Sequence, residues 1–347
     1  MSDIDLQDLQ GLVDAADDAA LLRAVDGLAA SRQWDVLADL ARRCRDAVEL
    51  GKQLWGVAMH IDYRLAWEGP AEHAGAALRP GAGRFALGPL TEVAASTHPW
   101  DELAPYLSDP ATNGAVAQER VIRGEDLRGR PDVMAAELPL ALTAWEPRYA
   151  LPRYRDRSAL FPAPPLPDPA DAGRALPRAR AGALDDGGRA LADTVRAWSA
   201  ESDGVVAVAC VEGDALDAIG ALAAEAEVAE LAAAEALALL QWAGASGGAR
   251  GRRPGGAAGR FAAWWTAAAL TGLSWPEEGQ DDLEAFAADL GAAVSEVQWL
   301  RWRPPGPETG WVLRLAVTDP ADGLAWAIDA HDTAPDDLAS RPAAAEG

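Results

Sequence analysis

The chain contains 347 residues, carries a formal net charge of -24, and is 50% apolar. Because a single hydrophobic core stops growing below this length, two domains are expected. The surplus of carboxylates repels phosphate backbones and anionic lipid, so general binding to nucleic acid or to a membrane is not expected. The remaining candidate partners are another protein and, locally, a small anionic ligand.

The acidic amino terminus and the lack of a long apolar run predict a cytoplasmic protein. No run of about 18 uncharged apolar residues occurs, and residues 1–8 are acidic where a secretory signal needs positive charge. Cys44 and Cys210 lie among apolar residues, so they are expected to be small buried hydrophobes and not a disulfide. Lys52 is the only lysine and Asn113 the only asparagine, which is typical of a high-GC bacterial genome.

Residues 5–123 show the periodicity of amphipathic helices. Leu37, Leu40, Ala41 and Cys44, for example, recur at helical spacing. The pattern predicts helices at 5–15, 17–31, 33–49, 52–68, 70–79, 88–97, 99–107 and 111–123. Short connections imply antiparallel neighbours, in either a bundle or a solenoid-like stack. Because no repeat period holds beyond two helices, no helical-repeat family is indicated.

Residues 131–177 contain ten prolines. Proline fixes φ and removes a backbone donor, which favours polyproline II and excludes a central strand. A PxxP ligand is one interpretation of this stretch, and a rigid spacer is the commoner one. Because Tyr149, Tyr154 and Phe161 are bulky apolar side chains, the alternative to a linker is a strap that packs on a domain.

The C-terminal part has a mixed pattern. Residues 204–211 form an apolar run typical of a strand, and residues 297–303 and 311–317 alternate as two strands of a hairpin. Asp319-Pro320 has the N-cap and the first-turn proline of a helix start. Further helices are predicted at 214–224, 227–243, 260–272 and 281–294. Three strands with several helices predict a small sheet covered on one face.

Together these patterns predict an α+β protein that is predominantly helical. An N-terminal helical bundle or solenoid-like domain is expected over residues 1–130, followed by a proline-rich linker or packed strap over 131–184. A C-terminal α+β domain with a small sheet is expected over 185–333, and a disordered tail over 334–347.

Residues 244–260 combine seven glycines with four arginines. Positive charge is otherwise scarce in the C-terminal part, because the chain from residue 185 onward has 10 basic and 27 acidic side chains. Glycine lets backbone N–H groups approach an anion, and a following helix would present its positive N-terminal end. The loop is therefore the candidate anion- or nucleotide-binding site, with candidate contacts at Arg250, Gly251, Arg252, Arg253 and Arg260. The competing interpretation is that these arginines neutralise neighbouring carboxylates.

The same loop contains short motifs of other classes. Residues 244–248 satisfy G-x-S-x-G around Ser246, but the preceding segment is predicted to be helical, whereas a nucleophile elbow needs a strand there. Residues 250–254 approach the core of a minor-groove AT-hook, which the surrounding negative charge opposes. Neither G-x-x-x-x-G-K-[ST] nor G-x-G-x-x-G occurs. No catalytic residue is predicted.

The chain has 14 tryptophans. Trp264 and Trp265 follow Phe261 at the spacing of a core-facing helical stripe, so packing is expected for both. Trp299 and Trp302 have opposite parity on the predicted hairpin and therefore point to opposite faces of the sheet. At least one of them is exposed unless another element covers it. The candidate partner surface therefore comprises Trp299, Trp302 and Trp311.

Neither a metal nor a cofactor is predicted. The four histidines form no H-x-x-H or H-E-x-x-H pair, and neither cysteine belongs to a C-x-x-C motif. The leading hypothesis is a non-enzymatic module that binds another protein. The alternative is an anion- or nucleotide-binding protein or enzyme built around residues 244–260.

Overall fold

The computed structural model describes residues 6–79, 82, 87–169, 173–276 and 283–333. The chain divides into two compact units, each built from two stretches of sequence. Unit 1 comprises Met1–Leu140 and Pro152–Phe161, and unit 2 comprises Ala141–Leu151 and Pro162–Gly347. The proline-rich segment therefore contributes to both units. The tail predicted at 334–347 lies outside the described residues.

Unit 1 consists mainly of helices, and the helices predicted from periodicity are confirmed. They are α1 (Leu6–Ala15), α2 (Asp18–Ala30), α3 (Trp34–Glu49), α4 (Trp55–Glu68), α5 (Ala71–Ala77), α6 (Leu90–Ala95), α7 (Trp100–Leu103), the 3-10 turn η1 (Ala104–Tyr106) and α8 (Pro110–Ile122). A short antiparallel hairpin, β1 (Arg153–Arg155) and β2 (Ser158–Leu160), completes the unit.

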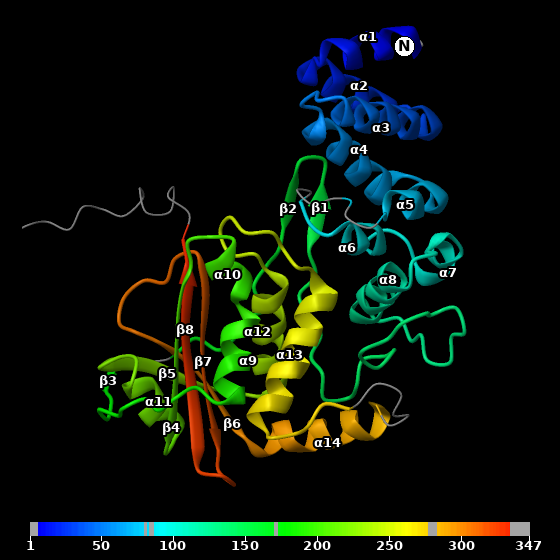
Figure 1. Cartoon of the computed structure of the whole chain (residues 1–347). Coiled ribbons are helices and arrows are strands. Elements are labelled where there is room, and N and C mark those ends of the chain that lie inside the picture. The colour runs from blue at the N-terminus through cyan, green and yellow to red at the C-terminus, as the bar shows by residue number, and fades with distance from the viewer. Residues whose placement is uncertain (1–5, 80–81, 83–86, 170–172, 277–282, 334–347) are drawn as a thin grey trace, which may run out of the picture. The chain divides into compact units, whose positions relative to one another are not determined.

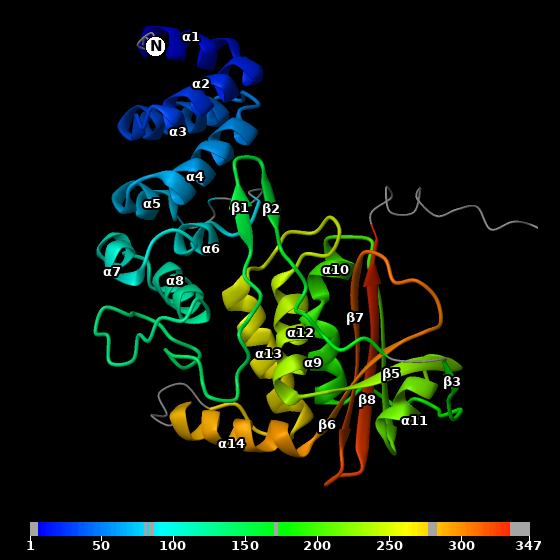
Figure 2. The ribbon, with the colours of Figure 1, turned by 180° about the vertical axis from the view of Figure 1, so that it is seen from behind.

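The helices of unit 1 form a solenoid-like stack. The main contacts of each helix are with helices one or two places along the chain, and Figures 1 and 2 show the helices following one another along the unit. The apolar stripe of α3 explains this packing, because Leu37, Leu40, Ala41 and Cys44 are all buried.

Unit 2 holds a six-stranded antiparallel sheet that curves into a half-barrel, in the strand order β3-β5-β6-β7-β8-β4. The strands are β3 (Arg174–Ala175), β4 (Val205–Glu212), β5 (Glu225–Leu231), β6 (Gln298–Arg303), β7 (Trp311–Asp319) and β8 (Leu324–Asp332). The helices are α9 (Asp186–Thr194), α10 (Arg196–Ala200), α11 (Ala215–Gly220), α12 (Ala233–Ala245), α13 (Gly256–Leu270) and α14 (Leu283–Glu296). The predicted fold class, α+β and predominantly helical, is confirmed by 47% helix and 15% strand.

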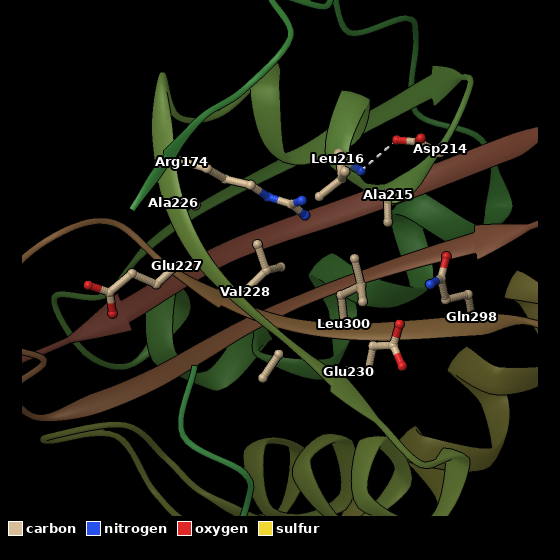
Figure 3. Close-up of a pocket in the computed structure, with 11 residues that line it drawn as sticks. Arg174, Asp214, Ala215, Leu216, Ala226, Glu227, Val228, Glu230, Gln298 and Leu300 are labelled. Atoms are coloured by element: carbon tan, nitrogen blue, oxygen red, sulfur yellow. Dashed lines mark hydrogen bonds between the residues drawn. The ribbon is translucent and has the colours of Figure 1, made fainter. Parts of the chain in front are cut away.

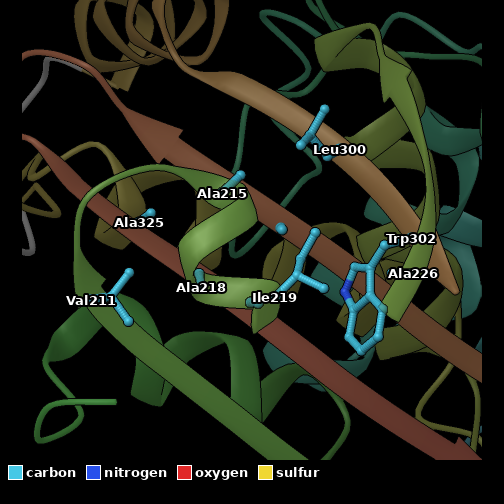
Figure 4. Close-up of a cluster of buried hydrophobic side chains, with 10 residues drawn as sticks. Val211, Ala215, Ala218, Ile219, Ala226, Leu300, Trp302 and Ala325 are labelled. Atoms are coloured by element: carbon cyan, nitrogen blue, oxygen red, sulfur yellow. The ribbon is translucent and has the colours of Figure 1, made fainter. Parts of the chain in front are cut away.

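Both faces of the sheet carry helices. Figure 1 places α9, α12 and α13 on one face and the short helix α11 on the other. Figure 4 shows α11, with Ala218 and Ile219, packed over the sheet residues Leu300 and Trp302. The same buried cluster includes Ala327 of β8. The prediction that helices cover only one face of the sheet was therefore incomplete.

The helix predicted over residues 227–243 is wrong in its first part. Glu225–Leu231 forms β5, which pairs with β6, and the helix begins only at Ala233. Glutamate alternates with small or apolar residues over 225–228, as is typical of a strand, but the alternation breaks at Ala229, and alanine, glutamate and leucine all favour helices. Pairing with β6 decides the outcome, because tertiary contacts override these weak propensities.

The last predicted helix is also wrong. Asp319 ends β7, and its carboxylate accepts a hydrogen bond from the backbone N–H of Ala321 at 2.8 Å. Gly323 then adopts φ 66°, and Leu324–Asp332 returns as β8. Aspartate followed by proline is a turn signal as well as a helix-start signal, and here it marks a β-hairpin.

Candidate functional site

The glycine- and arginine-rich loop connects two closely packed helices. α12 ends at Ala245 and α13 begins at Gly256. A Cβ atom added at Gly259 would lie 2.7 Å from the Cβ of Ala245, and one added at Gly244 would lie 2.9 Å from the Cβ of Ala262. These two glycines therefore allow the helices to approach each other, which is a packing function.

Arg250 and Arg252 hold carboxylates of the segment that precedes β4. Nη1 of Arg250 lies 3.0 Å from Oδ2 of Asp203, and Nη2 and Nε of Arg252 donate to the two oxygens of Glu201 at 2.8 and 2.9 Å. The backbone N–H groups of this turn also have acceptors, since that of Arg250 donates to Oγ of Ser202 at 3.1 Å. Both guanidinium groups remain about half exposed.

The other two candidates on the loop are more enclosed. Arg253 is half-buried and makes contacts of its own. Gly251 lies against the carbonyl oxygen of Gly247, which leaves no space for a side chain. The loop is thus a tightly folded connection, as in the competing interpretation.

Arg260 is fully buried and binds an internal carboxylate. Its Nε and Nη2 atoms donate to the two oxygens of Glu146 at 2.7 and 2.8 Å, and neither side chain is exposed. Glu146 also accepts hydrogen bonds from Nε1 of Trp264 at 2.9 Å, from the hydroxyl of Tyr149 at 2.8 Å and from the backbone N–H of Thr143 at 2.9 Å. This arginine therefore secures the segment 141–151 to unit 2.

Ser246 of the G-x-S-x-G motif is buried and makes hydrogen bonds within the protein. The residue is 1% exposed, and its hydroxyl donates to the carbonyl of Ala243 at 3.0 Å while it accepts from Nε1 of Trp198 at 2.8 Å. It follows helix α12 and not a strand. The geometry of a nucleophile elbow is therefore absent here, as the sequence context predicted.

The tryptophans proposed for a partner surface are packing residues. Trp299 is 2% exposed and donates from Nε1 to the carbonyl of Val294 at 3.0 Å, while Trp302 is 0% exposed on the other face, beneath α11. Trp311 is half-buried and stacks on Trp242, with ring centroids 5.0 Å apart. The two faces of the sheet are covered at Trp299 and Trp302, so neither indole reaches solvent.

Within unit 2, an exposed aromatic side chain lies on α13. Trp264 is buried as predicted, but its neighbour Trp265 is 44% exposed. Trp265 contacts Phe261 and Trp275, with ring centroids 6.3 and 5.4 Å apart respectively. A hollow of about 370 Å³ lies beside this cluster, between α9 and α13. Adjacent residues of a helix point about 100° apart. The sequence could therefore have shown that the two neighbouring tryptophans face different surroundings.

A larger hollow of about 480 Å³, which we call the β5 groove, lies between α11 and the β5 end of the sheet (Figure 3). Its lining residues are Arg174 of β3, Asp214, Ala215 and Leu216 at the start of α11, Ala226, Glu227, Val228, Ala229 and Glu230 of β5, and Gln298 and Leu300 of β6.

The start of α11 shapes one wall of the β5 groove. Asp214 and Asp217 form a capping box, in which each carboxylate accepts a backbone N–H of the other end of the turn. The N–H of Ala215 donates to Oγ1 of Thr318 at 2.7 Å, which fixes this turn against β7. Leu216 is thereby held opposite Val228, as Figure 3 shows.

The charges of the β5 groove differ in how they are satisfied. Glu227 pairs with Arg303 at 2.5 Å, and Asp214 accepts N–H groups at the start of α11. Arg174 and Glu230 are exposed, and within the described ranges their side chains make no hydrogen bond or ion pair. Figure 3 shows Arg174 extending over the groove from one side and Glu230 on the opposite side, beside Leu300.

The sequence analysis did not select Arg174 or Glu230. Arg174 lies in the proline-rich segment, which was predicted to be a linker or strap, and Glu230 lies in the stretch predicted to be helical. Polar–apolar alternation along Glu225–Leu231 could not have found Glu230, because in a strand Glu230 shares one face with Val228.

The cysteines and carboxylates show no metal-binding arrangement in the part of the chain that is described. Cys44 and Cys210 are buried and free, and burial raises the pKa of each thiol to about 11. No group of three or more histidine, cysteine, aspartate or glutamate side chains within the described ranges could hold a metal ion. Among the same residues, no helix has the length and apolar character needed to cross a membrane.

The fold defines an α+β protein with a helical N-terminal unit and an antiparallel half-barrel sheet in its C-terminal unit. The chain belongs to the family of unknown function DUF6183, which it matches over residues 19–334. Comparison with curated proteins and with solved structures gave no match.

Proposed function

We propose that the chain is a protein-interaction module that acts by binding, and that the β5 groove is its binding site. The observation that carries this proposal is a hollow of about 480 Å³ with two charges, on Arg174 and Glu230, that no described residue satisfies. Surfaces that bind partners combine an apolar centre with polar groups at the rim.

The walls of the groove support a peptide as the occupant. Its floor is apolar, because Ala226 and Leu300 are buried and Val228 and Leu216 are partly buried. Asp214, Glu227 and Glu230 outnumber Arg174 on the lining, which favours a partner segment with positive charge. A second surface of the same acidic chain fits this charge less well.

Anion binding by residues 244–260 remains the alternative, and it has less support. Arg250, Arg252 and Arg260 already hold Asp203, Glu201 and Glu146 respectively, so an external anion would have to displace a carboxylate. A rise in melting temperature with phosphate or nucleotide that disappears in Arg252→Ala would favour this alternative.

The proposed function is tested by capture of partners with a groove variant and a matched control. Glu230→Arg combined with Val228→Glu changes the groove, whereas Glu212→Arg makes the same charge reversal on β4, outside its lining. We expect the wild type and Glu212→Arg to retain the same partner, and the double variant to lose it. Retention of that partner by a folded double variant would refute the proposed site.

A further inference from the structure

The outward side of α13 is apolar from one end to the other. Every residue of this helix that is exposed or half-buried is alanine, phenylalanine or tryptophan: Ala257, Ala258, Phe261, Ala262, Trp265 and Ala269. The one charged side chain of α13, that of Arg260, is buried. A helix that faces water usually carries polar and charged residues on that side. This surface, which we call the α13 stripe, is therefore suited to pack against another apolar surface.

The α13 stripe borders the hollow of about 370 Å³ between α9 and α13. One wall consists of Ala190, Asp193 and Thr194 of α9, and the other of Phe261, Ala262, Trp265 and Thr266 of α13. The hydroxyls of the two threonines lie 2.8 Å apart and hydrogen-bond to each other, so they need no further partner. Asp193 is the one charged residue among the described lining. The hollow can therefore receive an apolar side chain such as an indole.

The exposed side of α9 carries charges that alternate in sign. In chain order these residues are Asp186, Arg189, Asp193 and, two positions beyond the end of α9, Arg196. Asp186 pairs with Arg189 at 2.5 Å, and Asp193 pairs with Arg196 at 2.6 Å. All four side chains are more than half exposed, so these pairs contribute little to the fold. Each carboxylate can accept further hydrogen bonds from a partner.

This order of charges is complementary to itself when two copies of α9 run antiparallel. A twofold axis close to Leu191 would place Arg189 opposite the partner's Asp193, and Asp186 opposite the partner's Arg196. A parallel pair would place each charge opposite its own copy, which is repulsive. The net charge of -24 opposes association of two chains in general. On this surface two aspartates and two arginines balance, so two copies can approach here without that local repulsion.

We propose that a second copy of this chain binds at the hollow between α9 and α13, so that the protein forms a dimer with a twofold axis. This surface shares no lining residue with the β5 groove, and the inference does not depend on the proposed function. Trp265 of each copy enters the partner's hollow beside the partner's α13 stripe, which removes its exposed 44% from water. Burial of the indoles supplies the affinity, and the charges of α9 set the antiparallel orientation.

The mass of the full chain in solution, measured by sedimentation equilibrium over a range of concentrations, tests the dimer. We expect the mass of two chains at high concentration and a shift toward the mass of one chain on dilution. Trp265→Ser should raise the dissociation constant by about tenfold or more. Trp55→Ser is the matched control, because Trp55 is 57% exposed in unit 1, outside this surface, and should leave the dissociation constant unchanged.

Two charge reversals test the orientation of the helices. Asp193→Arg places two arginines at the central contact, and Arg189→Asp places two aspartates there, so each variant alone should have the mass of one chain. An equal mixture of the two variants restores opposite charges at both central contacts and should have the mass of two chains, one of each variant. Each substitution breaks only an exposed ion pair, so circular dichroism should show the helix content of the wild type.

Several outcomes would overturn the inference. One is a wild-type chain that has the mass of one chain at every concentration, and another is a dimer that Trp265→Ser leaves unchanged. Charge variants that stay dimeric, or that dissociate and are not restored by mixing, would show that α9 does not pair with its copy in this orientation. None of these outcomes would affect the proposed function, because capture of a partner by the β5 groove is measured with different variants.

Discussion

Arg260 and Arg174 show two opposite uses of the same side chain. Arg260 lies in the region where the sequence concentrates positive charge, yet it is fully buried and its Nε and Nη2 atoms donate to Glu146. Arg174 lies in the proline-rich segment, yet it is exposed at a hollow with no acceptor among the described residues. The density of arginines along the sequence therefore does not show which guanidinium groups have partners within the protein.

The difference teaches that the surroundings of a charge decide its function. A buried charge must be paired and hydrogen-bonded within the protein, because removing it from water costs several kcal/mol, on the order of the stability of a whole domain. An exposed charge at the edge of a hollow is already hydrated and can exchange water for a partner. The first kind holds the fold together, and the second is a candidate for recognition.

Arg260→Met is expected to have the largest effect on stability. The substitution leaves the carboxylate of Glu146 buried without its counter-ion, which lowers the free energy of unfolding by about 3–5 kcal/mol. Urea denaturation followed by tryptophan fluorescence measures the change. Arg252→Met is the matched control, because its pair with Glu201 is about half exposed and screened by water, so the loss should be much smaller. Equal losses in the two variants would contradict the distinction between them.

Gly259→Ala is expected to have the next largest effect. The added methyl group would meet the carbonyl oxygen of Gln241 and the Cβ of Ala245, so α12 and α13 must separate. Such overpacking lowers the free energy of unfolding by about 1–3 kcal/mol. Gly11→Ala in α1 is the matched control, since nothing lies within 4 Å of its added Cβ and alanine favours a helix. Thermal denaturation of both variants gives the comparison.

The pair of Arg260 and Glu146 also predicts a dependence of stability on pH. Burial opposes ionisation of Glu146, but the hydrogen bonds and charge of Arg260 outweigh burial and lower the pKa of the carboxyl. A lowered pKa in the folded state stabilises the fold above the pKa of the unfolded state, and this contribution is lost as pH falls through the folded value. Arg260→Met should therefore flatten the acid side of the stability profile. An unchanged slope would argue against an ionised Glu146.

The fold could be predicted where apolar periodicity was strong. The stripe of Leu37, Leu40, Ala41 and Cys44 is an example, and its helix was placed within a residue of α3. Local signals failed where two structures share them. Glu225–Leu231 has residues that favour a helix and an alternation that favours a strand, and only its pairing with β6 decides between them.

The site could not be predicted because it depends on contacts between distant residues. Arg174 reaches the groove because β3 pairs with β5, and the register of that pair connects positions about 50 residues apart. The burial of Trp302 likewise depends on α11, which covers its face of the sheet, and the indole of Trp299 donates to the carbonyl of Val294 in α14. The alternation of side chains along a strand predicts that the two tryptophans point to opposite faces of the sheet. It does not predict which elements cover each face.

Arg174→Gln is expected to have the smallest effect on stability and is the sharpest test of the comparison. The guanidinium has no partner among the described residues, so the free energy of unfolding should change by less than about 0.5 kcal/mol. Denaturation of this variant beside Arg260→Met would then show one arginine that the fold needs and one that it does not. A loss as large as that of Arg260→Met would mean that Arg174 stabilises the fold, and its assignment to recognition would be wrong.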